Sequence, residues 1–131
     1  MKQTAIVIAP GRGTYNKAEL GYLARPHPGA AHQAAFDTYR EALGQPTLTE
    51  LDGATRFSAA LHTRGDNASA LIYASALADF AAIDRDSFEI LGVTGNSMGW
   101  YIALACAGAL DPLGGLQVVN TMGTLMHNHM I

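Results

Sequence analysis

The chain has 131 residues, of which 49% are hydrophobic and 15% charged, with a formal net charge of −3. This composition is that of one packed globular domain and excludes a disordered chain. The acidic balance without a basic patch argues against a nucleic-acid partner. The apolar run near the N-terminus is too short to span a bilayer and lacks a signal-peptide cleavage pattern, so a cytoplasmic location is expected.

The first half of the chain predicts one strand followed by short helices. Residues 5–9 form a continuous apolar run closed by Pro10 and Gly11, which predicts a strand buried on both faces. A loop over residues 11–15 follows the strand. Four helices are then expected from spacing and turn residues, over residues 16–23, 30–43, 48–52 and 54–62.

The second half predicts a helix, a strand, a sharp turn and two more helices. The segments are 68–83 with Asn67 as its cap, the buried strand 88–94, the turn 95–99, the all-round apolar helix 98–109 stopped by Asp111-Pro112, and the helix 116–131. This order predicts an α/β fold with a parallel sheet and flanking helices. The single cysteine, Cys106, excludes an intrachain disulfide and is expected in the core.

Two features lead us to expect that the chain is incomplete by itself. Two strands buried on both faces need neighbours on both edges, and the helical pattern continues to the last residue without a stop signal. We therefore expect the 131 residues alone to fold poorly or to aggregate, because strand edges and an apolar helix would be exposed.

Gly95-Asn96-Ser97-Met98-Gly99 has the form G-x-S-x-G of a nucleophile elbow. In this motif the serine lies on a strained strand-to-helix turn, and its neighbours two positions away must be small because helix and strand approach closely. The turn also directs the N-terminus of the following helix at the reacting centre, where the helix dipole stabilises negative charge. Ser97 is therefore the predicted catalytic nucleophile.

A serine needs a base to act as a nucleophile, and in elbow enzymes the histidine base follows the serine. Only His127 and His129 follow Ser97, and on a helix two residues apart they point in different directions. We expect both to be exposed or frayed helix residues. The base is then expected beyond Ile131.

The segment from Ile90 to Asp111 closely resembles the malonyl-CoA:acyl-carrier-protein transacylases, the acyltransferases of fatty-acid and polyketide synthesis. Their elbow reads G-H-S-x-G-E and is followed by Y-x-A-L-x-x-A-G-x-L/I-D, which the run from Tyr101 onward matches densely. Residues 8–13 resemble the family's first strand and P-G-Q-G loop, and residues 69–75 resemble its P-A-L-L-x-A-S helix. These landmarks occur in the right order and cover most of the chain.

The resemblance implies an α/β-hydrolase-like large subdomain, of which residues 1–131 would form the N-terminal part, ending near the start of a ferredoxin-like small subdomain. It implies that Ser97 takes the acyl group of an acyl-CoA as an ester and passes it to the thiol of an acyl carrier protein. The backbone N–H groups of Met98 and Arg12 would form the oxyanion hole. The histidine base would lie in the C-terminal remainder of the enzyme, and the resemblance implies acyl-CoA as substrate with no metal or further cofactor.

The sequence departs from the family at four positions. Asn96 replaces the histidine before the nucleophile, Trp100 replaces the glutamate after the elbow, and Arg12 replaces the loop glutamine. Most important, Met122 replaces the arginine of M-R-G that holds the malonyl carboxylate. Because a buried carboxylate without that partner is costly, an uncharged acyl group is expected instead of malonyl.

Several of these residues have two interpretations. Asn96, Trp100 and Met122 are candidate substrate-binding residues, although Trp100 would equally pack under a loop. Arg12 either supplies a positive charge to the substrate or is a solvated loop residue. Four methionines line an acyl pocket or simply fill the core: Met98, Met122, Met126 and Met130.

Three functions are compatible with these residues. The first is acyl transfer from acyl-CoA to a carrier protein, and the second is an acyl hydrolase or thioesterase that uses the same serine. The third is a non-catalytic fragment or docking piece, favoured by the missing base and opposed by the intact Ser97 and its glycines.

Overall fold

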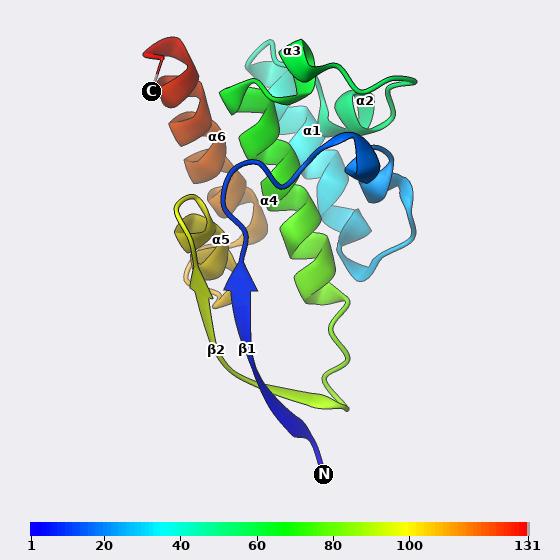
Figure 1. The fold of residues 1–131 in the computed structure, drawn as a ribbon, viewed down its shortest axis with the longest axis vertical. Coiled ribbons are helices and arrows are strands. Elements are labelled where there is room, and N and C mark those ends of the chain that lie inside the picture. The colour runs from blue at the N-terminus through cyan, green and yellow to red at the C-terminus, as the bar shows by residue number, and fades with distance from the viewer. Residues whose placement is uncertain (131) are drawn as a thin grey trace.

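The computed structural model describes residues 1–130, which form a two-stranded parallel sheet packed against helices (Figure 1). The elements are β1 (Gln3–Ala9), η1 (Lys17–Glu19), η2 (Tyr22–Ala24), η3 (Pro28–His32), α1 (Gln33–Ala42), α2 (Leu48–Asp52), α3 (Ala59–His62), α4 (Gly65–Ala81), β2 (Phe88–Gly95), α5 (Gly99–Cys106) and α6 (Pro112–Asn128). The expected α/β class with a parallel sheet and flanking helices is confirmed.

The two strands lie side by side and run in the same direction. Gln3 pairs with Phe88 at one end and Ala9 pairs with Gly95 at the other, with one irregularity between Ala5 and Ile6. Since parallel strands end at the same edge, the loop after β1 and the turn after β2 meet there. This edge carries the residues predicted for the active site.

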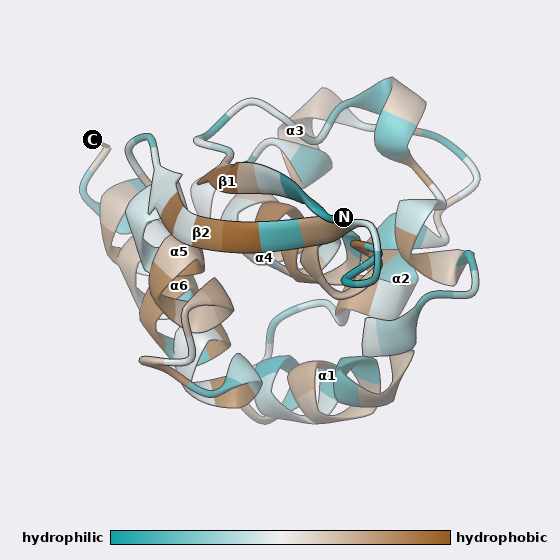
Figure 2. Ribbon diagram, turned by 90° about the horizontal axis from the view of Figure 1, so that it is seen from below, coloured by the Kyte–Doolittle hydropathy of each residue, from teal (hydrophilic) through white to brown (hydrophobic). Residues whose placement is uncertain are grey.

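Within residues 1–130 the helices cover one face of the sheet only. Figure 2 shows α4, α5 and α6 on the same side of the two strands. On the other face Ile6, Ile8 and Leu91 are 63%, 72% and 64% exposed. The expected burial of both faces is therefore wrong for the part of the chain described, because alternate strand residues point away from the helices.

Arg40 connects three helices in the core, where it is fully buried. Its guanidinium donates to the side-chain oxygens of Asn67 on α4 and Asn120 on α6, each at 2.5 Å. It also donates to the backbone oxygens of Pro46 at 2.7 Å and Asp66 at 3.0 Å. Burial lowers the pKa of Arg40. The hydrogen bonds to these four oxygens replace the hydration that the guanidinium loses on burial.

Asn67 therefore does not cap α4, contrary to the sequence expectation. The helix begins earlier, at Gly65, and the Asn67 amide also donates to the Leu61 carbonyl at 3.0 Å. The partners that hold Asn67 lie far away in sequence, so a local capping rule does not find them.

The expected helix over residues 16–23 is also wrong. Two short 3₁₀ turns, η1 and η2, replace it, and Gly21 between them has a φ of 88°, which an α-helix does not allow. The expected helix over 54–62 shortens to α3, whose N-terminus is capped by the Ser58 hydroxyl. The helix predicted over 48–52 is present with those bounds as α2, and the other predicted helices and strands are present with shifted ends.

The elbow helix α5 is exposed on one side rather than buried all round. Trp100 and Leu104 are 57% and 45% exposed, and Cys106 is half-buried. Burial raises the pKa of the Cys106 thiol. Asp111 starts α6 rather than stopping α5, since its carboxylate accepts from the Gly114 amide at 2.6 Å with proline at the first helical position.

None of the helices in residues 1–130 is long and apolar enough to cross a membrane.

The Arg40 contacts yield a stability prediction. Arg40→Ala removes the donor to four buried oxygens, and we expect it to lower the free energy of unfolding by about 3 kcal/mol or more. Urea denaturation followed by circular dichroism measures the change. The control is Arg56→Ala at an exposed position, where a change within about 0.5 kcal/mol is expected. Equal effects of the two substitutions would contradict the role given to Arg40.

Candidate active site

Ser97 lies on the sharp turn between β2 and α5. Its φ is 55°, in the left-handed region that residues other than glycine adopt only under constraint. The residue is exposed, and α5 begins two positions later at Gly99. The turn therefore has the strained backbone of a nucleophile elbow and presents the hydroxyl to solvent.

Glycines allow the backbones around the elbow to touch. A Cβ on Gly95 would lie 2.5 Å from the Trp100 nitrogen and closer still to the Gly99 carbonyl. A Cβ on Gly99 would lie 2.9 Å from the Pro10 oxygen, and one on Gly11 would lie 2.9 Å from the Asn96 oxygen. No side chain fits at these positions, so the loop after β1 is held directly against the elbow.

The amide of Met98, the residue just before α5, differs from the three amides that follow it. The next three amides, of Gly99, Trp100 and Tyr101, donate to the carbonyls of residues 96–98 at 2.9–3.1 Å. The Met98 amide has no such backbone partner among residues 1–130. An N–H group at the start of a helix next to a serine hydroxyl is the usual stabiliser of a tetrahedral oxyanion.

Ser97 opens into a cavity of about 200 Å³, which we call the inner chamber. Its lining residues are Arg12, Ser69, Ser97, Met98, Tyr101, Val119, Met122, Gly123 and Met126. Among the residues that line it, Arg12 alone carries a charge. The chamber is thus a largely apolar pocket with Ser97 at its wall and one cation at its side.

The chamber brings together four of the six residues singled out from the sequence: Ser97, Met98, Arg12 and Met122. Asn96 and Trp100 are exposed and do not line it. The sequence analysis missed Ser69, Tyr101 and Val119. Tyr101 follows Ser97 by four positions, and because this is the spacing of neighbours on a helix, the sequence could have predicted it near the serine. Ser69 and Val119 reach the site only through tertiary packing.

Arg12 is held at the site by a loop with buried anchors. The Tyr15 hydroxyl donates to Asp52 at 2.6 Å, and the Leu23 amide donates to the other oxygen of the same carboxylate at 3.0 Å. Asp52 and Tyr15 are 2% and 3% exposed. Burial of the ring and this hydrogen bond raise the pKa of Tyr15, which keeps it a neutral donor. The loop that carries Arg12 is therefore fixed to α2.

Met122 is carried by α6, which packs closely on α4. A Cβ on Gly123 would lie 2.5 Å from the Gly65 oxygen and 2.7 Å from the Ser69 hydroxyl oxygen. At the other end of the same interface, the Tyr73 hydroxyl donates to the Pro112 carbonyl at 2.6 Å. This contact fixes the position of the Met122 side chain relative to Ser97.

None of the histidines in residues 1–130 lines the inner chamber. His62 is buried and its Nε2 contacts the Leu51 carbonyl at 2.7 Å. His27 lines a separate cavity of about 160 Å³. His129 is exposed, as expected, whereas His127 is half-buried on α6 beside Gly65, so the expected exposure is wrong for His127.

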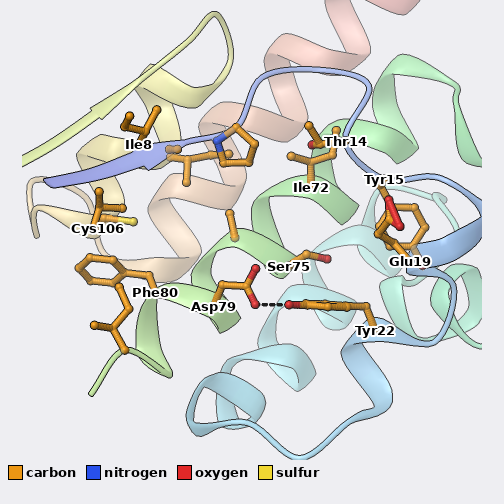
Figure 3. Close-up of a pocket in the computed structure, with 16 residues that line it drawn as sticks. Ile8, Thr14, Tyr15, Glu19, Tyr22, Ile72, Ser75, Asp79, Phe80 and Cys106 are labelled. Carbon is orange, nitrogen blue, oxygen red and sulfur yellow. Dashed lines mark hydrogen bonds between the residues drawn. The ribbon is translucent and has the colours of Figure 1, made fainter. Parts of the chain in front are cut away.

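A separate cavity of about 430 Å³ lies between β1, α4 and α5 (Figure 3). Its polar residues include Tyr22, whose hydroxyl donates to Asp79, and this hydrogen bond raises the pKa of Tyr22. Ser97 does not line this cavity. Its size therefore does not make it the site of the serine chemistry.

Comparison of the fold with solved structures identifies its relatives. A malonyl-CoA:ACP transacylase from Synechocystis sp. PCC 6803 is 28% identical with a TM-score of 0.68, over 96% of this chain and 40% of that one. The enzyme from Mycobacterium tuberculosis is 25% identical with a TM-score of 0.75, over 96% and 41%. The chain has the fold of a malonyl-CoA:acyl-carrier-protein transacylase.

The likeness covers nearly all of this chain but only about two fifths of each transacylase. A third neighbour, described as a type II PKS acyl-carrier protein in complex with its malonyl-transacylase, is 23% identical with a TM-score of 0.73 and shares the fold. No protein-family model and no curated protein matches the sequence. The resemblance found in the sequence to this family is confirmed by the structural neighbours.

The packing at the elbow predicts a sharp difference between two glycines of β2. Gly95→Ala places a methyl group against the backbone of α5, and we expect a loss of about 3 kcal/mol in unfolding free energy. Gly92→Ala is the control, because a Cβ there meets nothing within 4 Å. Thermal or urea unfolding of the two variants tests this, and an equal loss would show that the elbow tolerates separation of strand and helix.

Proposed function

We propose that the protein is an acyltransferase that moves an acyl group from acyl-CoA to an acyl carrier protein through an ester on Ser97. The observation that carries the proposal is the position of Ser97. It lies on a left-handed turn at the wall of an apolar chamber, beside the free amide of Met98. The transacylase fold supports this choice among serine chemistries.

In the first step the Ser97 oxygen attacks the thioester carbonyl carbon, and the carbonyl oxygen becomes an oxyanion that accepts from the Met98 amide. The carbon–sulfur bond then breaks and CoA leaves. The hydroxyl proton passes to a base and from it to the CoA sulfur. In the second step the carrier-protein thiol gives its proton to the base and its sulfur attacks the ester carbonyl carbon. The bond from that carbon to the Ser97 oxygen breaks, and the serine takes the proton from the base.

The base is not supplied by the residues that line the inner chamber, which include no histidine and no carboxylate. We propose that a histidine in the C-terminal remainder of the enzyme provides it. The solved transacylases are about two and a half times as long as the part that matches this chain, which supports a contribution from such a segment.

The inner chamber favours an uncharged acyl group. Met122, which lines it, stands at the position where the transacylase motif M-R-G has the arginine that binds the malonyl carboxylate. Arg12 is the one cation at the chamber, but it belongs to the loop after β1 and is exposed. A carboxylate beside Met122 would lose its water without gaining an ionic partner.

The deciding experiment is intact-mass spectrometry of the full-length protein, with any polypeptide that co-purifies, after incubation with a panel of acyl-CoAs. We expect an added acyl mass that maps to Ser97, is absent in Ser97→Ala, and disappears when a phosphopantetheinylated carrier protein is added. Release of the acyl group as free acid without a carrier would identify a hydrolase. An unmodified Ser97 with every acyl-CoA would favour the non-catalytic alternative.

Met122→Arg gives a second test of the same site. A bidentate arginine–carboxylate pair is about 1.5–3 kcal/mol more favourable than no partner, so we expect the ratio of malonyl to butyryl labelling of Ser97 to rise at least tenfold. Leu125→Arg is the matched control, since Leu125 lies on the same helix, is 48% exposed and lines no part of the chamber. An unchanged ratio in Met122→Arg would show that residue 122 does not determine the choice between malonyl and uncharged acyl groups.

A further inference from the structure

A second cavity, of about 430 Å³, lies directly beyond the inner chamber, and we call it the outer chamber. Its lining residues are Arg12, Gly13, Tyr15, Asn16, Thr63, Gly65, Ala68, Ser69, Ile72, Met126, His127 and Met130. We infer that the acyl group carried by this enzyme is an alkyl chain longer than about eight carbons, which runs from Ser97 through the inner chamber into the outer one. This inference rests on the proposed function.

The volume of the inner chamber sets the length at which the outer chamber is needed. A cavity of about 150 Å³ is known to hold benzene, or about 25 Å³ per carbon. On that scale the inner chamber, at about 200 Å³, holds about eight carbons. An acyl chain longer than this, attached to Ser97, needs space beyond the inner chamber.

The outer chamber is the adjoining space, because the two cavities have lining residues in common. Arg12, Ser69 and Met126 line both of them. On α4 the residues Ala68, Ser69 and Ile72 line the outer chamber in succession, a spacing that places them on one face of the helix. The path therefore runs along one side of α4, between that helix and the last turns of α6.

The outer chamber is suited to the end of a neutral chain. Its floor is formed by Tyr15 and Ile72, which are 3% and 2% exposed and separate it from the cavity of Figure 3, which they also line. Polar groups such as Asn16 and Thr63 are exposed at its rim. Arg12 and His127 also line the chamber and no carboxylate does, but the buried side chains of its floor offer a surface on which an alkyl chain is expected to pack.

The test compares chain lengths in wild type and in variants that fill the outer chamber. Labelling of Ser97 by dodecanoyl-CoA and by hexanoyl-CoA is measured on the full-length protein by intact mass. Ala68→Phe and, separately, Thr63→Phe place a ring in the outer chamber without touching the inner one. We expect each to lower the ratio of dodecanoyl to hexanoyl labelling at least tenfold. The matched control, Ala82→Phe, lies just after α4 at an exposed position that lines neither chamber, and should leave the ratio unchanged.

The outcomes separate this inference from the proposed function. Wild-type labelling by hexanoyl-CoA or malonyl-CoA but not by dodecanoyl-CoA overturns the inference and leaves the acyltransferase intact. An equal loss of dodecanoyl and hexanoyl labelling in Ala68→Phe and Thr63→Phe also overturns the inference. If Ser97 takes no label at all, the inference is tested by the binding of dodecanoyl-CoA to Ser97→Ala, with and without Ala68→Phe. Tight binding that Ala68→Phe weakens tenfold supports a chain site in the outer chamber. Absence of binding refutes that site.

Discussion

Backbone packed against backbone is the constraint on which the site depends. The segment after β1 and the turn after β2 approach so closely that a single Cβ at Gly99 would meet the Pro10 carbonyl at 2.9 Å. The Asn96 amide adds a hydrogen bond to the Ala9 carbonyl at 3.4 Å. Because the two loops cannot separate without breaking these contacts, Arg12 and Ser97 face the same chamber. The strained backbone of Ser97 is tolerated for the same reason: its surroundings leave it no other conformation.

A second constraint acts behind the site, where helix packing shapes the chambers. Arg40 holds α4 and α6 together through side-chain amides on each, and Gly123 lets the two helices lie close beside Ser69. The walls of both chambers come from these helices. A polar network in the core, which lines neither chamber, and a glycine at the helix interface, which lines the inner one, thus determine the space available to a substrate.

The features predicted correctly from the sequence are those encoded within a few neighbouring residues. The G-x-S-x-G pattern predicted a strained serine between strand and helix, and the apolar runs predicted both strands. The errors have a common origin in distant contacts. Asn67 looks like a cap but binds Arg40, 27 positions earlier, and Asp111 looks like a stop but its carboxylate starts the next helix.

The same distinction holds for the site. Met122 and Arg12 were found because each replaces a residue of a known motif, whereas Ser69 and Val119 carry no motif and enter the chamber only through the packing of α4 and α6. The exposed face of Ile6 and Ile8 could not be foreseen either, because a continuous apolar run does not show how many layers cover it.

The parallel pairing of β1 with β2 also has a consequence for how the chain is made. Gln3 pairs with Phe88, 85 positions later, so β1 leaves the ribosome long before its partner strand exists. At about 5–20 residues per second, β1 waits roughly 4 to 17 s for that partner. During this time Ile6 and Ile8 have no sheet neighbour, and contacts of such long sequence separation form slowly even afterwards. The sheet therefore cannot form until β2 has been made, and the apolar strand β1 has to remain unpaired until then.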